Sequence, residues 1–166
     1  MRYNSLREYF YKFHNLLYAI SLIPLLAFVV LYWQIQEGNL HGIFYLEEVI
    51  NQVLLFSLGF VVLADWVITF FLFNKGLRSA RKLPGLGIKL DRYYNLTLLR
   101  FTIVLSGSLT FAIGFYLTEN QVFTILAVLN FFLLLLLWPS PAKVCGDLQL
   151  KGDERTLVRF KKDKLH

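Results

Sequence analysis

Residues 75–92 read KGLRSARKLPGLGIKLDR and separate two long apolar stretches, at about 49–74 and 94–117. The connector carries six Lys and Arg residues, and its Pro-Gly-Leu-Gly sequence breaks a helix. Each flanking stretch is long enough to cross a bilayer as a helix. Short loops rich in Lys and Arg stay on the cytoplasmic side of a membrane. The connector therefore predicts two membrane spans that meet at the cytoplasmic face.

The same charge pattern extends over all 166 residues. Two further apolar stretches lie at about 15–34 and 122–138. The segment before the first stretch carries three Lys and Arg residues, and the segment after the last carries seven. The other two connections carry none, and their charged residues are Glu37, Glu47, Glu48 and Glu119. This alternation predicts four spans with both termini in the cytoplasm.

Composition supports a membrane protein of one domain. The chain is 57% hydrophobic, with a mean hydropathy of +0.54, and a soluble domain is usually only about half apolar. We expect an all-α integral membrane bundle of four antiparallel helices. Residues 1–14, which alternate aromatic and charged side chains, fit an interfacial amphipathic segment. Residues 15–138 form the predicted transmembrane domain, and residues 139–166 form a basic cytoplasmic tail.

The net charge of +6 and the sequence pI near 9.5 would suggest a nucleic-acid partner in a soluble protein. Here the cations follow the predicted topology, so we interpret them as facing anionic lipid headgroups on the cytoplasmic side, with no nucleic-acid partner. The expected headgroup contacts are Arg78, Arg81, Lys82, Arg159, Lys161 and Lys162.

Three polar residues interrupt three different apolar stretches at a similar depth. With a rise of about 1.5 Å per residue, Asp65, Arg100 and Asn130 lie roughly 13, 10 and 12 Å from the inner ends of their spans. An intramembrane carboxylate is costly and needs a partner or water. In one interpretation Asp65 and Arg100 form a buried ion pair that Asn130 completes. In the other, Asp65 titrates or binds a cation on an ion pathway, and Arg100 tunes its pKa.

The third span carries a series of small and hydroxyl residues at every fourth position. In lipid, helices associate where small residues let their backbones approach and where hydroxyls bond across. We expect a helix-packing ridge, whose partner is the second span, the fourth span or another subunit. Its members, with Gly107 beside them, are Thr102, Ser106, Thr110, Gly114 and Thr118.

No motif indicates an enzyme, a metal site or a cofactor. The histidines His14, His41 and His166 lie far apart in the predicted topology, and no spacing matches a zinc or iron site. The single cysteine, Cys145, cannot form an internal disulfide, so we expect a free reduced thiol.

The second half of the chain, about 90–150, contains a series of short motifs. They are Tyr93-Tyr94, Leu99-Arg100-Phe101, Gly107, Phe111-Ala112, Tyr116-Leu117-Thr118-Glu119-Asn120, Trp138-Pro139-Ser140, Lys143 and Asp147-Leu148. This series resembles a family of small four-span bacterial inner-membrane proteins of unassigned function. The resemblance implies the bacterial inner membrane and no mechanism. Such proteins often carry a Glu where this chain has Ser106, so no role of that acid carries over.

These observations predict a non-enzymatic accessory or scaffolding subunit that packs against other membrane helices in a larger complex. The alternative is a small oligomeric ion or proton channel or transporter with Asp65 on the pathway, because four spans are too few to enclose a wide path alone. A membrane enzyme is the third and weakest hypothesis. The expected partners are therefore membrane lipids and either other membrane subunits or further copies of this chain.

Overall fold

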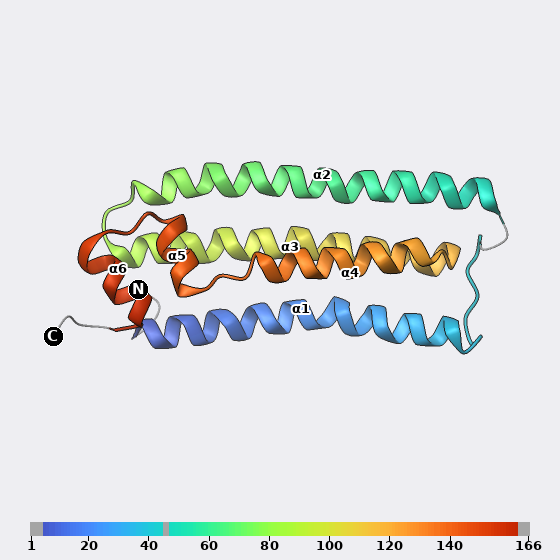
Figure 1. Cartoon of the computed structure of the whole chain (residues 1–166), viewed down its shortest axis with the longest axis horizontal. Coiled ribbons are helices and arrows are strands. Elements are labelled where there is room, and N and C mark those ends of the chain that lie inside the picture. Colours follow the sequence, from blue (N-terminus) through green and yellow to red (C-terminus); the bar gives the residue numbers. More distant parts are fainter. Residues whose placement is uncertain (1–4, 45–46, 163–166) are drawn as a thin grey trace. The chain divides into compact units, whose positions relative to one another are not determined.

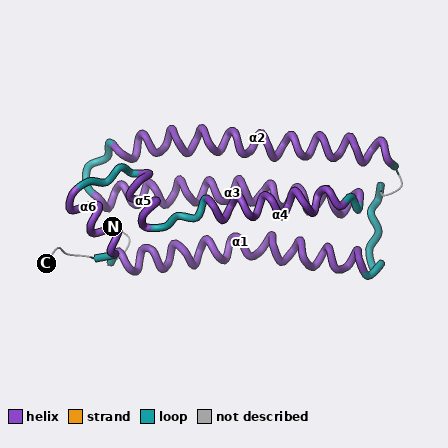
Figure 2. Tube along the Cα trace, viewed as in Figure 1, coloured by secondary structure: helices purple, strands orange, loops and turns teal. Residues whose placement is uncertain are grey.

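The computed structural model describes residues 5–44 and 47–162, and within them it contains six helices and no strand (Figure 1). Figure 2 shows these helices and the short loops that join them. The helices are α1 (Leu6–Gln36), α2 (Glu48–Arg81), α3 (Leu86–Thr118), α4 (Gln121–Leu136), α5 (Pro141–Asp147) and α6 (Gly152–Phe160). The all-α class predicted from the sequence is confirmed for this part of the chain.

Three helices, α1, α2 and α3, are long and apolar enough to cross a membrane. The fourth, α4, has 16 residues, so it is about 24 Å long, shorter than the roughly 30 Å hydrocarbon core. It reaches the required length only together with α5. The described chain thus has three such helices, or four if α4 and α5 form one span, as expected of a multi-pass membrane protein.

The chain divides into two compact units, and α1, α2 and α3 contribute to both. We call the first the basic unit (Met1–Ala19, Phe70–Arg100 and Trp138–His166) and the second the apolar unit (Ile20–Thr69 and Phe101–Leu137). All 15 Lys and Arg among the described residues belong to the basic unit, with two, seven and six in its successive segments. The boundary between the two units, which follows from residue contacts, therefore also separates the part of the chain that carries cations from the part that carries none.

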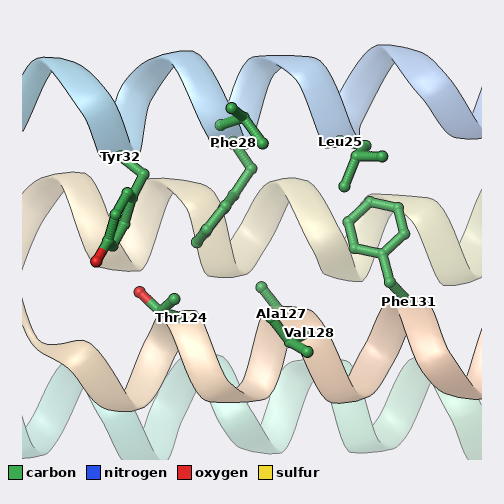
Figure 3. Close-up of a pocket in the computed structure, with 8 residues that line it drawn as sticks. Leu25, Phe28, Tyr32, Thr124, Ala127, Val128 and Phe131 are labelled. Carbon is green, nitrogen blue, oxygen red and sulfur yellow. The ribbon is translucent and has the colours of Figure 1, made fainter.

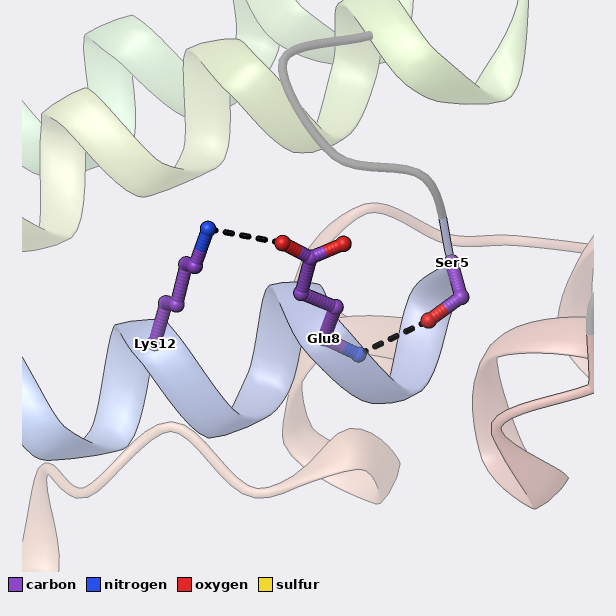
Figure 4. A network of polar contacts seen from close by, with 3 residues as sticks. All are labelled: Ser5, Glu8 and Lys12. Atoms are coloured by element: carbon purple, nitrogen blue, oxygen red, sulfur yellow. Dashed lines mark hydrogen bonds and ion pairs between the residues drawn. The ribbon is translucent and has the colours of Figure 1, made fainter.

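Of the predicted interfacial segment 1–14, residues 1–4 lie outside the described residues, and an interfacial position of the rest stays a prediction. From Leu6 onward its residues are the first turns of α1, which continues without a break to Gln36. Ser5 caps the helix, because the amide of Glu8 donates to its hydroxyl at 3.0 Å. The Glu8 carboxylate then pairs with Lys12 at 2.7 Å (Figure 4). A capped helix start continuous with the apolar stretch leaves no separate lead-in between residues 6 and 14.

The aromatic side chains of this first part of α1 are buried inside the basic unit. Phe10 and Phe13 are 1% and 0% exposed. The hydroxyl of Tyr9 donates to the carbonyl of Leu90 at 3.0 Å, and its ring lies beside that of Tyr94. These side chains therefore hold the first turns of α1 to α3.

The predicted basic tail is also a folded part of the basic unit. Ser140 caps α5, accepting from the amide of Lys143 at 3.2 Å, and Pro141 occupies the first turn. Apolar residues of the tail are buried: Val144, Cys145, Leu148, Leu150 and Val158. Because these side chains recur within an otherwise charged segment, the tail packs into its unit while most of its described cations are exposed.

Two hydrogen bonds and an ion pair join the tail to α2 and α3 within the basic unit. The hydroxyl of Tyr93 donates to the Asp147 carboxylate at 3.0 Å, and Arg81 Nε donates to the Asp147 carbonyl at 2.7 Å. Lys89 pairs with Glu154 at 2.8 Å. The tail is thereby held to both α2 and α3.

In the apolar unit, α3 is the most buried of the three long helices. Half of its most apolar stretch is buried, compared with 11% for α2. Near the end of α3, Gly114 lies against the Phe123 ring near the start of α4. Ser108, earlier on α3, accepts a hydrogen bond from Asn130, later on α4. The two helices therefore run antiparallel, as the short Glu119-Asn120 connection requires.

The connection between α1 and α2 folds onto the turn between α3 and α4. The amide of Phe44 donates to the carbonyl of Leu117 at 2.9 Å, and the amide of Gly42 donates to the Glu119 carboxylate. A Cβ at Gly42 would lie 3.0 Å from the Leu117 carbonyl oxygen. The close approach of these two backbones therefore requires a glycine.

Candidate functional site in the apolar unit

Asn130 is the centre of a buried hydrogen-bond network that joins three helices. It is 3% exposed. Its Oδ1 accepts from Trp66 Nε1 of α2 at 2.9 Å. Its Nδ2 donates to the Val104 carbonyl at 3.1 Å and to the Ser108 hydroxyl at 2.8 Å, both on α3. Both amide protons and the carbonyl of Asn130 are thus engaged, which fixes its orientation and the register of α2, α3 and α4.

The sequence indicated Asn130 but not its partners. The sequence does not distinguish Trp66 or Ser108 from other Trp and Ser residues, because neither belongs to a regularly spaced pattern. One signal was present: an indole N–H within an apolar span needs an acceptor, and Asn130 is the only amide side chain in the predicted fourth span.

Asp65 has a different environment from Asn130, although both belong to the apolar unit. It is partly exposed, and the Ser106 hydroxyl lies 3.5 Å from its Oδ2. That hydroxyl also lies 2.6 Å from the Ile103 carbonyl. A hydroxyl has one proton, and the shorter contact takes it. Since the apolar unit has no Lys or Arg, the Asp65 carboxylate has no cation within its own unit.

Arg100, the third member of the predicted cluster, belongs to the basic unit. Its guanidinium carbon lies 4.4 Å from the centre of the Phe73 ring, a cation–π contact. Its Nε is buried and has no hydrogen-bond partner among the described residues. Asp65 and Asn130 thus share one unit while Arg100 lies in the other, and the predicted Asp65–Arg100 ion pair stays a prediction.

The predicted ridge on α3 divides into a buried part and an exposed part. Gly107 is buried, and a Cβ added there would lie 3.0 Å from the side chain of Val62 on α2. Gly114 lies against Phe123 of α4, and Thr118 is buried. Thr102 and Ser106 are exposed, and Thr110 is partly buried. The ridge is therefore a contact face within the chain only at its C-terminal end.

The hydroxyls of the ridge bond mainly to their own helix. Thr110 donates to the Ser106 carbonyl at 3.0 Å, and Thr118 donates to the Gly114 carbonyl at 2.8 Å. Four residues turn a helix by about 400°, so each step of the ridge advances about 40° around α3. This winding carries the ridge from an exposed face at Thr102 to a buried one at Thr118.

Most of the predicted headgroup contacts are exposed side chains of the basic unit. Arg78, Lys82, Arg159 and Lys162 are exposed, and Lys161, also exposed, lies 5.5 Å from the centre of the Phe10 ring. Arg81 is partly buried, since it bonds to the tail. Contact of these side chains with lipid stays a prediction.

Cys145 is a free, buried thiol on α5. Burial raises the pKa of its thiol, although Arg155 and Arg159 lower it to a smaller extent. Within residues 5–44 and 47–162, no three His, Cys, Asp or Glu side chains are grouped so that they could hold a metal ion.

Comparison with protein families, with curated protein sequences and with solved structures gives no match to this chain.

Proposed function

We propose that this chain is a four-span protein of the bacterial inner membrane, in which α4 alone is a short fourth span and the basic unit, with α5 and both termini, lies in the cytoplasm. We further propose that it is a non-enzymatic accessory subunit that binds a helix of another membrane protein. The attachment surface is the partly exposed Asp65 on α2 with the neighbouring exposed Ser106 and Thr102 on α3, which we call the Asp65 face.

The topology is supported by the confinement of all described Lys and Arg residues to one unit. Lys and Arg in short connections orient spans so that they remain cytoplasmic. The apolar unit, whose helices are mostly exposed apolar surface, then contains the spans themselves and the two acidic outer connections.

The single observation that carries the accessory role is that the partly exposed Asp65 carboxylate has only one long contact, to Ser106 at 3.5 Å, and no cation in its own unit. A charged group within the membrane is costly unless it is paired or hydrated. Its own unit supplies no cation, and the one nearby hydroxyl is engaged elsewhere. A basic or amide-bearing side chain on a partner helix would satisfy the carboxylate, and the exposed hydroxyls would allow that helix to approach closely.

Copurification from the native host tests the proposal. We expect the wild-type chain to retain a stoichiometric membrane-protein partner in mild detergent, and Asp65→Asn and Asp65→Leu to lose most of it. Phe60→Leu is the control on the same helix, since Phe60 is 73% exposed and lies outside the Asp65 face. Retention of the partner by both Asp65 variants, or purification of the wild type without any partner, would contradict the accessory role.

The partly exposed carboxylate also supports the alternative of an oligomeric ion or proton channel or transporter. In that case copies of the chain would surround a path lined by Asp65. A symmetric homo-oligomer without other subunits, and liposome flux that vanishes in Asp65→Asn, would establish this alternative in place of the first.

A further inference from the structure

Arg100 has an unusual environment for a cation inside a folded unit. Its guanidinium carbon lies 4.4 Å from the centre of the Phe73 ring. The ring attracts the charge but has no oxygen that could accept the N–H protons. Arg100 Nε is buried without a hydrogen-bond partner among the described residues, and such buried donors are rare in proteins. The guanidinium therefore lacks the acceptors that a partly buried arginine normally has.

The terminal nitrogens of Arg100 are accessible from outside the unit. Arg100 as a whole is partly exposed. Its terminal nitrogens have no hydrogen-bond or ion-pair partner among the described residues either, yet only Nε is both buried and without a partner. A ligand can therefore reach the terminal N–H donors, although it cannot reach Nε.

Cations outnumber carboxylates around this guanidinium. Lys143 of α5 lies near enough to Arg100 for the two charges to act on each other. Burial lowers the pKa of Lys143, Arg100 lowers it further, and Asp147 raises it to a smaller extent. The Asp147 carboxylate accepts from the Tyr93 hydroxyl at 3.0 Å, and its backbone carbonyl accepts from a third cation, Arg81. The repulsion between Arg100 and Lys143 thus exceeds what Asp147 offsets, which favours a further anion beside them.

These cations lie where the chain passes from the basic unit into the spans. Arg100 is the last residue of the basic unit on α3, and Trp138 is the first residue of that unit after α4. The Trp138 ring lies 4.6 Å from that of Tyr18, which is also in the basic unit. Trp and Tyr are enriched at membrane interfaces. In the proposed topology, Arg100 and Lys143 are therefore at the level of the inner headgroups.

From these observations we infer that Arg100 and Lys143 bind a phosphate group, supplied by a phospholipid of the inner leaflet. The planar guanidinium matches two phosphate oxygens, and lysine adds a point charge. The phosphate would accept from the terminal nitrogens of Arg100 and offset the excess positive charge. This site differs from the exposed side chains expected to contact headgroups, because its arginine is partly buried. The inference rests on the membrane placement proposed above but not on the Asp65 face.

Lipid titration of the purified full chain tests this inference, with native mass spectrometry in detergent as the readout. The probe is phosphatidylglycerol, and the reference is a glucosyl diacylglycerol with the same acyl chains but no phosphate. We expect the wild type to bind its first phosphatidylglycerol about tenfold more tightly than the reference lipid. Equal affinity for the two lipids would overturn the inference, and this comparison needs no variant.

Two substitutions on α3 form a matched pair that separates this site from general attraction of anionic lipid. Arg100→Gln and Arg92→Gln each remove one positive charge, and Arg92 is exposed. We expect the first phosphatidylglycerol to bind about tenfold more weakly to Arg100→Gln, since charge-assisted hydrogen bonds are lost, and equally well to Arg92→Gln. Unchanged binding by Arg100→Gln, or an equal loss in both variants, would overturn the inference.

Melting temperatures distinguish a binding role of Arg100 from a purely structural one. A ligand that binds only the folded state stabilises it. Phosphatidylglycerol should therefore raise the melting temperature of the wild type and of Arg92→Gln, but not that of Arg100→Gln. Arg100→Lys keeps the cation without the planar fork and should show an intermediate rise. Equal stabilisation of all four chains by the lipid would overturn the inference.

Competition with inorganic phosphate identifies the source of the phosphate group. We expect inorganic phosphate to displace phosphatidylglycerol only at a large excess, because it lacks the acyl chains that hold the lipid beside the site. Displacement at equal concentration would overturn the assignment to a lipid and assign the site to a soluble phosphate. These outcomes are independent of copurification through Asp65, so failure of one proposal is distinguishable from failure of the other.

Discussion

Asn130 and Asp65 are both polar residues on apolar helices, but their surroundings assign them different roles. Asn130 is buried and uses its carbonyl and both amide protons within the chain. Asp65 is partly exposed and has one long contact. A buried group whose hydrogen bonds are all made stabilises a fold, whereas a partly exposed carboxylate with one long contact within the membrane favours a partner outside the chain. We therefore assign Asn130 to stability and Asp65 to recognition.

Replacement of Asn130 should destabilise the apolar unit. Asn130→Leu keeps the volume but leaves Trp66 Nε1 without its acceptor and Ser108 without its donor. Hydrogen bonds between membrane helices contribute about 0.6–2 kcal/mol each, so we expect a loss of roughly 1–3 kcal/mol in the free energy of unfolding. Unfolding in mixed detergent micelles measures it. Leu129→Ala, at an exposed position, is the control, and equal stability of the two variants would contradict this role.

The Cys145 thiol should react slowly with maleimide near neutral pH. Burial raises its pKa, so the thiolate is scarce in the folded chain. The unfolded chain releases its thiol proton at a lower pH than the folded chain. The contribution of this thiol to stability is therefore complete below the unfolded pKa and declines as pH rises through the folded pKa.

Labelling rates between pH 7 and 10 measure this shift. The reference is Thr156→Cys in a Cys145→Ser background, since Thr156 is exposed on α6. We expect Cys145 to label several-fold more slowly and its rate to rise at a higher pH. Identical rate profiles would show that the thiol is neither buried nor shifted.

At the residue scale, sequence reasoning located Asn130 by depth alone. It could not identify Trp66 or Ser108 as partners, because α2 and α4 are apolar around their whole circumference. Without an amphipathic stripe, the sequence does not indicate which face of a helix meets its neighbour.

At the element scale, α3 organises the apolar unit through two glycines that lie about two helical turns apart along one side of the helix. Gly107 approaches Val62 of α2, and Gly114 approaches Phe123 of α4. Small residues at both contacts let the two neighbouring helices pack closely. The winding of the ridge explains how one series of small residues contacts a partner at one end and remains exposed at the other.

Substitution of Gly114 tests this packing. A Cβ there would lie 2.5 Å from the Phe123 ring, which is fully buried. We expect Gly114→Ala to lower the free energy of unfolding by about 1–3 kcal/mol. Gly59 of α2 has no atom within 4 Å of its added Cβ, so Gly59→Ala should stabilise the chain by up to about 1 kcal/mol through helix propensity. The same sign for both substitutions would contradict the assigned α3–α4 contact.

Burial of Val144 should hold the tail in the basic unit. Val144 is 0% exposed, so Val144→Asp places a carboxylate in an apolar site and should release α5 and α6. Limited trypsin digestion at Lys151 and Arg155 should then be about tenfold faster, because cleavage requires local unfolding. Gly146→Asp, on the exposed side of the same helix, is the control. Equal digestion rates would show that the tail is held by other contacts.

The extent of the helices was harder to predict than their existence. Hydropathy located the four apolar stretches, but α2 extends to Arg81 and α3 starts at Leu86, so most of the predicted connector 75–92 is helical. Lys and Arg are good helix formers, and only Pro84-Gly85 stops the helix. The tail helices were missed because their apolar residues are few and follow no long period.

At the scale of the whole molecule, the unit defined by residue contacts is also the unit that carries the Lys and Arg residues. The basic unit contains every described Lys and Arg, the folded tail and the polar clamps around Asp147. The apolar unit contains the Asn130 network, the Asp65 face and an apolar groove between α1 and α4 (Figure 3). Charge alone predicted the topology, whereas the folding of the tail into the basic unit depended on tertiary contacts that charge does not specify.

Topology mapping with single cysteines tests the account most directly. In a Cys145→Ser background, Lys82→Cys and Lys161→Cys report on the basic unit, and Asn39→Cys reports on the connection between α1 and α2. All three positions are exposed. A membrane-impermeant maleimide should label Asn39→Cys in intact cells, and the other two only after permeabilisation. Labelling of Lys82→Cys and Lys161→Cys from opposite faces, or of Lys82→Cys and Asn39→Cys from the same face, would contradict the membrane arrangement on which both proposals depend.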